Sequence, residues 1–225
     1  MTDVIVFLGI QGSGKGTQAK LLAEETGFQH INIGDLFREQ ISKGSELGKK
    51  VQAIITRGDL VEDELVFELV ESSLAPDCPG IIFDGFPRTP AQAEYLLAHY
   101  NVKRVYYLDL SEADAISRIE ARRICSGCGE NYNLISRRPS QEGICDICGA
   151  DLIQRADDTG EAIRKRVNEF YMQTFQLKEL FKQKAALVEL SASQPIRDLK
   201  SIITKDIQLG DRKSTRLNSS HRIRS

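Results

Sequence analysis

The sequence predicts an α/β fold of three layers (αβα), in which a five-stranded parallel sheet lies between two layers of helices. Five apolar runs are typical of buried strands, and segments with helical spacing separate them. The runs are continuous rather than alternating, as expected of strands covered on both faces. We place the strands at Val4–Leu8, His30–Ile33, Gly80–Asp84, Arg104–Leu110 and Leu187–Leu190. Ligands of such sheets bind beyond the carboxyl ends of the strands, so a site is expected there.

Length and charge narrow the class of protein. A chain of 225 residues can bury a substantial core as one domain with insertions. No apolar run approaches the roughly 18–20 residues of a membrane helix, and no basic segment with a cleavage site opens the chain, so we expect a cytoplasmic location. The segment 211–225 holds five Lys and Arg, one Asp and no apolar periodicity, and we expect it to be non-native. Residues 1–210 then carry 25 Lys and Arg against 31 Asp and Glu, a net charge of −6 that disfavours a nucleic-acid partner.

A glycine-rich segment, Gly9–Thr17, follows the first strand and precedes a helical segment. This is the setting of a phosphate-binding loop (P-loop), because the N–H groups of the turn and the helix N-terminus point at an anion. Lys15 adds a compact positive charge for the outer phosphates. The pattern departs from G-x-x-x-x-G-K-[ST], since Gly16 follows the lysine and the hydroxyl comes at Thr17. A turn that binds nothing would need neither four glycines nor a lysine.

Polar residues also follow the second and third strands. Asp35 is expected to cap the next helix, and Arg38 lies one turn inside it. Asp84 ends the third strand, where a protein with a P-loop is expected to hold Mg²⁺ or its waters. Arg88 emerges from a Gly/Pro turn and suits the bidentate binding of phosphate oxygens. Gln92 lies four residues further on and could read the edge of a nucleotide base.

Helical patterns fill the rest of the chain. Arg118 and Arg122 are four residues apart, which puts them on one face of a predicted helix. Arg166 lies early in a long amphipathic segment that would cross back over the sheet. The expected helices are Gln18–Glu25, Glu46–Thr56, Asp63–Leu74, Ser111–Ile124, Gly160–Lys184 and Pro195–Ile207.

Four of the five cysteines form two Cys-x-x-Cys units, Cys125 with Cys128 and Cys145 with Cys148, sixteen residues apart. In a cytosolic chain this spacing is typical of a closed tetrahedral zinc site rather than of disulfides. Four thiolates leave no open position, so the metal is expected to be structural. It would stabilise an insertion of roughly 35 residues, which is too small to form a core of its own.

The polar residues favour a kinase whose acceptor is itself a phosphate. The sequence offers a P-loop, a carboxylate for Mg²⁺ and arginines from four separate segments, but only His30 and His99 outside the terminal segment 211–225. An alcohol acceptor would need a carboxylate base, whereas a phosphate monoester is already an oxyanion near pH 7, with a second pKa of about 6. Catalysis then consists of positioning and of neutralising the charge of the transferred group. The cysteine-bearing insertion is a candidate for a cover that excludes water.

The motifs GIQGSGKGTQ, IGDLFR, DGFPRT, QRADD and the paired Cys-x-x-Cys units resemble those of the adenylate kinase family, in its bacterial long form with a zinc-binding lid. The resemblance covers residues 1–210. It implies the reaction MgATP + AMP = 2 ADP, the cofactors Mg²⁺ and structural Zn²⁺, and a monomer without nucleic-acid or membrane partners. It also implies a P-loop core (1–31, 62–122 and 160–210), a segment that binds the nucleoside monophosphate (NMP segment, 32–61) and a lid (123–159).

The resemblance also assigns roles to residues. Those expected to bind ATP are Gly12, Ser13, Gly14, Lys15, Gly16, Thr17, Arg118, Arg122, Asn131, Tyr132 and Gln194. Those expected to bind AMP are Ile33, Arg38, Asp59, Leu60, Val61, Gly85, Phe86, Pro87, Arg88, Gln92, Arg155 and Arg166. The expected catalytic residues are Lys15, Asp84, Arg88, Arg122, Arg155 and Arg166, and Asp35 would help Asp84 to order the waters of Mg²⁺.

Two positions depart from the family pattern and leave alternatives open. Gln11 stands where the family usually has Pro, which should change only the stiffness of the loop. Ile33 stands where the family usually has Thr beside the AMP base, and related UMP/CMP kinases also lack that Thr. Gln92 favours adenine. The alternatives are therefore a UMP/CMP or other nucleoside monophosphate kinase and, from another class, a nucleotide switch or nucleic-acid-binding module with a zinc ribbon.

Overall fold

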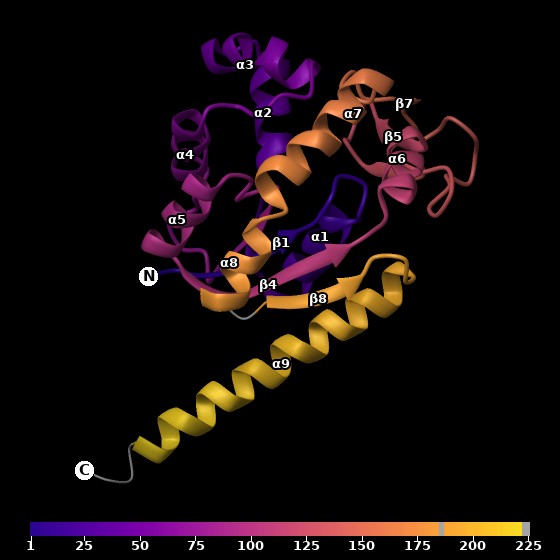
Figure 1. Cartoon of the computed structure of the whole chain (residues 1–225). Helices are drawn as coiled ribbons and strands as arrows, with labels where there is room; N and C mark the ends of the chain where they lie inside the picture. The colour runs from indigo at the N-terminus through magenta and orange to yellow at the C-terminus, as the bar shows by residue number, and fades with distance from the viewer. Residues whose placement is uncertain (185–186, 222–225) are drawn as a thin grey trace.

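The computed structural model describes residues 1–184 and 187–221, and its centre is a parallel five-stranded sheet (Figure 1). The order in the sheet is β2-β3-β1-β4-β8, and every neighbouring pair is parallel. This confirms the predicted three-layer fold, with strand ends within a few residues of those expected. The strands are β1 (Asp3–Leu8), β2 (Gln29–Asn32), β3 (Ile81–Asp84), β4 (Asn101–Asp109) and β8 (Leu187–Ser191).

Helices cover both faces of this sheet, as neighbouring side chains of β4 show. Successive side chains of a strand point to opposite faces. The hydroxyl of Tyr106 donates to Asp206 of α9 (Ile196–His221) at 2.9 Å, whereas the ring of Tyr107 lies 6.5 Å from that of Phe175 on the other face. On the α9 face, α1 (Lys15–Thr26) is joined to α9 by a hydrogen bond from the Gln18 amide to the carbonyl of Ile196.

The NMP segment rises beyond the carboxyl end of the sheet as helices α2 (Ile33–Ser42) and α3 (Glu46–Thr56), and α4 (Asp63–Ser72) leads back (Figure 1). The prediction that Asp35 caps α2 is wrong. The cap is Asn32, whose side chain accepts the N–H of Asp35 at 2.9 Å, because Asn32 is the last extended residue before the helix.

The lid contains a small antiparallel sheet that the sequence did not predict, with the order β6-β5-β7. Helix α6 (Glu112–Glu120) ends earlier than expected, and Arg122 begins β5 (Arg122–Cys125), so Arg118 and Arg122 do not share a helical face. Arg122 adopts the strand conformation because it pairs with Asn133 of β6 (Asn131–Asn133). On its other side β5 pairs with β7 (Leu152–Ile153).

The predicted long helix is interrupted. It comprises α7 (Gly160–Glu169), a π-turn η1 (Phe170–Thr174) and α8 (Leu177–Lys184). Within η1 the N–H of Phe175 bonds to the carbonyl of Phe170, five residues back, at 2.8 Å. The turn therefore contains one more residue than an α-helical turn.

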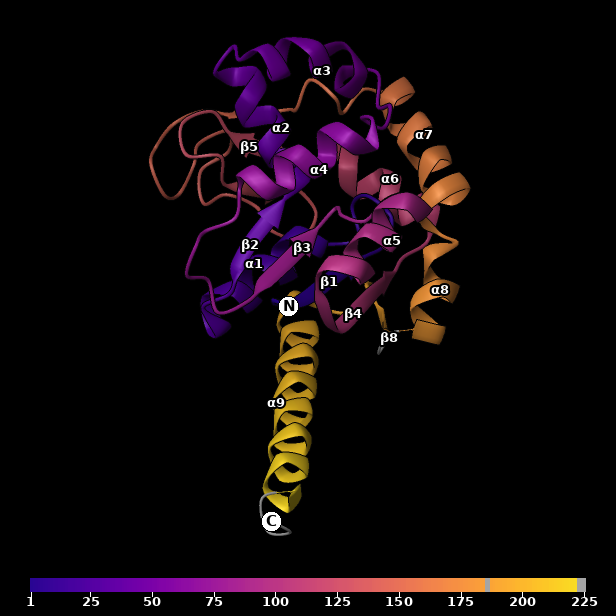
Figure 2. The ribbon, with the colours of Figure 1, turned by 90° about the vertical axis from the view of Figure 1, so that its left-hand side faces the viewer.

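The remaining helices follow α4 and β8. Helix α5 (Pro90–His99) begins at the cap Thr89, and α9 runs past the predicted end at Ile207 and projects away from the sheet (Figures 1 and 2). The backbone of α9 thus continues through most of the segment expected to be non-native, and residues 222–225 lie outside the described residues. Within the described residues, none of the helices is both long and apolar enough to cross a membrane.

Candidate active site

The P-loop lies between β1 and α1, and its glycines are needed by its backbone. Gly9, Gly12 and Gly14 have φ values of 139°, 85° and 91°, which residues with a side chain rarely adopt. A Cβ atom on Gly12 would lie 2.8 Å from the carbonyl oxygen of Ala115 in α6. The buried hydroxyl of Ser13 has no partner among the described residues. The loop thus directs main-chain N–H groups and an unsatisfied hydroxyl to the start of α1, where an anion is favoured.

Lys15 folds back over this loop. Its Nζ donates to the carbonyl oxygens of Gly9 at 2.7 Å and Ile10 at 2.9 Å. Burial, together with the positive charges of Arg88, Arg122 and Arg166, lowers the pKa of Lys15 to about 8, although Asp84 opposes the shift. Burial and the neighbouring cations disfavour the charged form of Lys15, and a bound phosphate would stabilise that form.

Asp84 at the end of β3 faces the first turn of α1. Its Oδ2 accepts a hydrogen bond from the Asn32 amide at 2.5 Å and lies 3.7 Å from Nε2 of His30. Burial alone would raise the pKa of Asp84, but His30, Lys15 and Arg88 hold it below its ordinary value. A Cβ at Gly16 would come within 2.9 Å of Oδ2, so the glycine after the lysine makes room for this carboxylate. The departure from the general P-loop pattern therefore has a steric cause.

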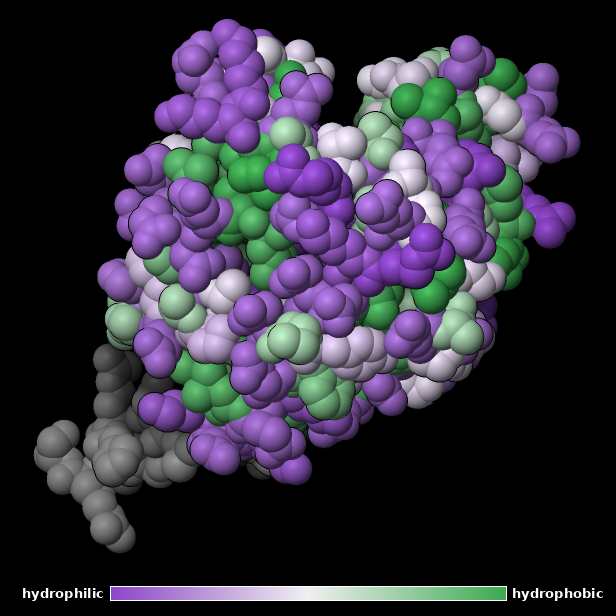
Figure 3. All heavy atoms as spheres, turned by 45° about the horizontal axis from the view of Figure 1, so that its top comes forward, coloured by the Kyte–Doolittle hydropathy of each residue, from purple (hydrophilic) through white to green (hydrophobic). Residues whose placement is uncertain are grey.

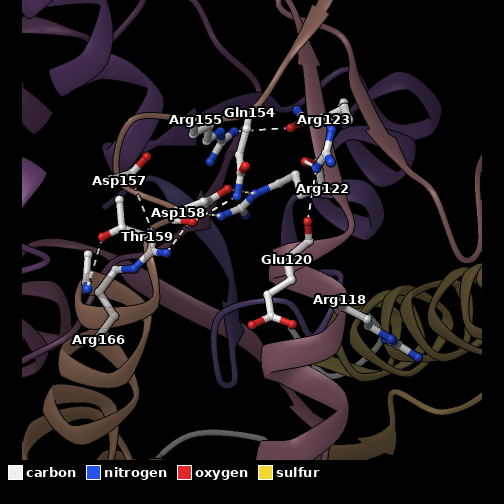
Figure 4. Close-up of polar contacts among 12 residues, drawn as sticks. Arg118, Glu120, Arg122, Arg123, Gln154, Arg155, Asp157, Asp158, Thr159 and Arg166 are labelled. Carbon is white, nitrogen blue, oxygen red and sulfur yellow. Dashed lines mark hydrogen bonds and ion pairs between the residues drawn. The ribbon is translucent and has the colours of Figure 1, made fainter. Parts of the chain in front are cut away.

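Two carboxylates that the prediction did not include hold the arginines on either side of the lid, Arg122 and Arg166. Asp158 accepts two hydrogen bonds from Arg122, at 2.8 and 2.5 Å, and one from Arg166 at 2.8 Å (Figure 4). Arg166 also donates to Asp157 at 2.9 Å. Burial would raise the pKa of Asp158, but Arg122 and Arg166 lower it. Arg122 of β5 and Arg166 of α7, 44 residues apart in sequence, thus share the carboxylate of Asp158.

Arg38 and Arg155 extend this cluster to the NMP segment. Arg38 donates to Asp35 at 2.6 Å and lies 3.8 Å from Asp157, which places α2 beside the chain that leaves the lid. Arg155 donates to Asn131 at 3.1 Å and lies 3.5 Å from Asp35. Asp35 is therefore paired with arginines in this structure. Burial lowers the pKa of Arg155 to about 10, which leaves it charged near pH 7.

Arg88 faces the P-loop from the turn after β3. Its Nε donates to the carbonyl of Gly85 at 2.9 Å, and its own carbonyl accepts the hydroxyl of Thr174 in η1 at 2.9 Å. Burial lowers the pKa of Arg88 to about 10. A cavity of about 30 Å³ has Gly9 and Lys15 on one side and Gly85 and Arg88 on the other, so the loop and the arginine border one space.

The expected monophosphate site borders a larger cavity of about 430 Å³. Asp59, Leu60 and Val61 line it from the NMP segment, together with Asp63 and Thr89. Four other residues expected at this site are buried and do not line the cavity, namely Ile33, Phe86, Pro87 and Gln92. The surface view shows a notch between two lobes beyond the sheet, with mostly hydrophilic residues around it (Figure 3).

Three of the expected ATP ligands lie apart from the arginine cluster. Arg118 points away from it and donates to the carbonyl of Ala192 at 3.0 Å, in the turn after β8 that also contains Gln194 (Figure 4). Tyr132 is buried within the lid, where its hydroxyl lies 3.5 Å from Sγ of Cys145. An ATP contact by Tyr132 would therefore fall to its main chain, whereas Arg118 and Gln194 mark a separate region at the edge of the core.

The four lid cysteines converge as their spacing predicts. Their Sγ atoms lie within 4.8 Å of one another, with Cys125 and Cys148 at 3.3 Å and Cys128 and Cys145 at 3.6 Å. Zn–S bonds of about 2.3 Å place the sulfurs of a tetrahedral site roughly 3.8 Å apart. Main-chain N–H groups also donate to the sulfurs of Cys125 and Cys145, as thiolate ligands require. This cluster fits a metal ion and, with four sulfur donors, suits zinc.

Sequence reasoning thus missed Asn32, Asp157, Asp158 and Thr174. The only signal was the pair of adjacent carboxylates after Arg155, in a chain whose arginines needed counter-ions. Asn32 and Thr174 act through contacts with Asp84 and Arg88 that no local pattern shows.

The residues brought together form a cationic site beside a P-loop, and they suit transfer of a phosphoryl group between two phosphates. The family model described as adenylate kinase matches residues 7–186. The adenylate kinase of Thermosipho melanesiensis is 42% identical over 212 residues, which cover 91% of this chain and 98% of that protein. That of Caldicellulosiruptor saccharolyticus is 41% identical over 208 residues (89% and 97%), and that of Methanocella arvoryzae is 39% identical over 215 (92% and 98%). The chain belongs to the adenylate kinase family.

Proposed function

We propose that this chain catalyses the reversible transfer of the terminal phosphoryl group of MgATP to AMP, which yields two ADP. The observation that supports this most is the convergence of Arg38, Arg88, Arg155 and Arg166 on the P-loop side of the sheet, from four separate segments. One phosphate would need only a few of these cations. Their number suits two phosphates that repel each other while a group passes between them.

In the proposed reaction an oxygen of the AMP phosphate forms a bond to the γ-phosphorus, and the bond from that phosphorus to the β,γ-bridging oxygen breaks. No base is required, because the attacking oxygen is already ionised. Lys15 and the P-loop N–H groups would hold the donor phosphates, and Arg88 and Arg38 the acceptor phosphate. Mg²⁺ would neutralise charge between the donor phosphates, and Asp84 would hold the waters of that ion.

Arg122 and Arg166 would exchange Asp158 for phosphate oxygens when the substrates bind. The two carboxylates, Asp157 and Asp158, keep both guanidinium groups ordered in the absence of an anion. This pre-organisation reduces the entropy lost when the site closes around the transferred group. Zinc would have the separate role of holding the lid together.

The expectations of a monomer, of a cytoplasmic location and of no nucleic-acid partner stay predictions. The preference for AMP over UMP or CMP also stays a prediction, because Ile33, the buried first residue of α2, stands where the family usually has Thr.

A steady-state assay with ATP and each of AMP, UMP, CMP and GMP tests the proposal directly. We expect AMP to give the highest kcat/KM, and faster turnover of UMP or CMP would replace it with the alternative kinase. Arg122→Ala should lower kcat by at least about 100-fold, because it removes a charge from the transition state. Arg123→Ala is the matched control at the next position. Among the described residues, the Arg123 side chain donates hydrogen bonds only to the main-chain carbonyls of Glu120 and Arg122.

A further inference from the structure

The side chain of Gln92 is held in one orientation by two partners of opposite kind. Its Nε2 donates to Oδ1 of Asp63 at 2.7 Å, and its Oε1 accepts the main-chain N–H of Arg88 at 2.8 Å. A carboxylate can only accept and a main-chain N–H can only donate. Turning the amide by 180° would therefore set oxygen against oxygen at Asp63 and N–H against N–H at Arg88.

Neighbouring residues also fix the position of the Asp63 carboxylate, which accepts the N–H of Gln92. It is the first residue of α4, and its carboxylate also accepts the hydroxyl of Thr89 at 3.1 and 3.0 Å. Thr89 in turn caps α5, the helix that carries Gln92, so the acceptor and the amide are held by the same turn. Gln92 is only 2% exposed, which leaves bulk water little access to replace either partner.

The locked amide retains one N–H and one oxygen lone pair, because a primary amide has two of each. A base that meets this edge must place its donor at Oε1 and its acceptor at Nε2. Adenine offers an amino donor at C6 and an acceptor at N1. Hypoxanthine and guanine offer the reverse, an acceptor at C6 and a donor at N1, so they would need the flipped amide.

We infer that Asp63 is a specificity-determining residue, which selects 6-amino over 6-oxo purine monophosphates by fixing the orientation of the Gln92 amide. The inference rests on the proposed function, in which Gln92 faces the base of the acceptor. Asp63 acts through Gln92 and is a positioning residue. Its removal should change the choice of base more than the rate with AMP.

The test compares AMP with IMP, two nucleotides that differ only at the edge in question. Asp63→Asn keeps the size of the side chain but allows an N–H to face a flipped amide. We expect the ratio of kcat/KM for AMP to that for IMP to fall about tenfold, since one hydrogen bond to a charged group is worth about an order of magnitude. Glu64→Gln, which removes the neighbouring carboxylate of the same helical turn, should leave the ratio unchanged.

Titration of AMP and IMP without ATP gives the same ratio from Kd values, and it separates this inference from the proposed function. A parent protein that binds AMP but does not phosphorylate it would refute the function. The ratio of its Kd values for AMP and IMP would still test whether Asp63 fixes the orientation of the Gln92 amide. An unchanged ratio in Asp63→Asn, or an equal loss of affinity for both nucleotides, would overturn the inference. Asp63→Glu, which can again only accept, should retain most of the preference.

Discussion

Raising the pH through 8 should remove the charge of Lys15 and with it the capacity to capture ATP. The pKa of Lys15 is lowered to about 8, primarily because the group is buried over the P-loop. With that value the charged fraction falls from about nine tenths at pH 7 to about one tenth at pH 9, so kcat/KM for ATP should fall about tenfold over this interval. The alkaline limb of kcat should lie at higher pH, because bound phosphates favour the charged lysine.

The assay measures ADP directly by chromatography at saturating AMP, so that no coupling enzyme has to tolerate pH 9. Lys15→Arg is the control, since a guanidinium stays charged throughout. It should be slower, but its profile should lack the limb near pH 8. An identical limb in Lys15→Arg would refute the reasoning.

The same shift predicts the direction of a stability change. The folded pKa of Lys15 lies below the ordinary value of 10.5, so the unfolded chain binds this proton more tightly. The charged lysine therefore opposes folding below about pH 8, and its contribution becomes less unfavourable as the pH rises towards 10.5. Urea unfolding of the parent and of Lys15→Met should show the variant to be the more stable at pH 7, with a difference that shrinks by pH 10.

Three further outcomes are expected. Asp158→Asn should lower the free energy of unfolding by about 3–5 kcal/mol in urea titrations, because it leaves Arg122 without its buried counter-ion and Arg166 with Asp157 alone, and a loss below 1 kcal/mol would contradict this. Thr174→Val should lower kcat/KM for AMP about fivefold by freeing the carbonyl of Arg88, with recovery in Thr174→Ser and no change in the control Thr204→Val, a half-buried threonine of α9 that bonds to Glu25. Chelation of the lid metal should lower Tm more than it lowers activity at low temperature, and loss of chemistry alone would assign the metal to catalysis.

The sheet was predictable because its strands are covered on both faces. Continuous apolar runs such as that of β1 record this burial directly in the sequence. The P-loop and the cysteine cluster were predictable for a related reason, since glycine conformations and thiolate geometry restrict the residue types and their spacing.

The lid sheet and the arginine partners were not predictable in this way. Arg122 continued the helical spacing set by Arg118, and only its pairing with Asn133 draws it into β5. Strands of two to four residues are too short to give a periodic signal. Asp157 and Asp158 resemble an ordinary acidic turn until the folded chain brings Arg166 beside them.

The π-turn at Phe170–Thr174 makes the length of this part of the chain critical. Its extra residue rotates everything that follows by about 100° relative to a continuous α-helix. Helix α7 can thus turn Arg166 to Asp157 and Asp158 while α8 turns Phe181 into the core. Deleting one residue here would convert the turn to α-helix and misalign one of the two faces, although no side chain had changed its chemistry. We therefore expect natural variation in this segment to be confined to substitutions, with insertions and deletions accepted only outside it.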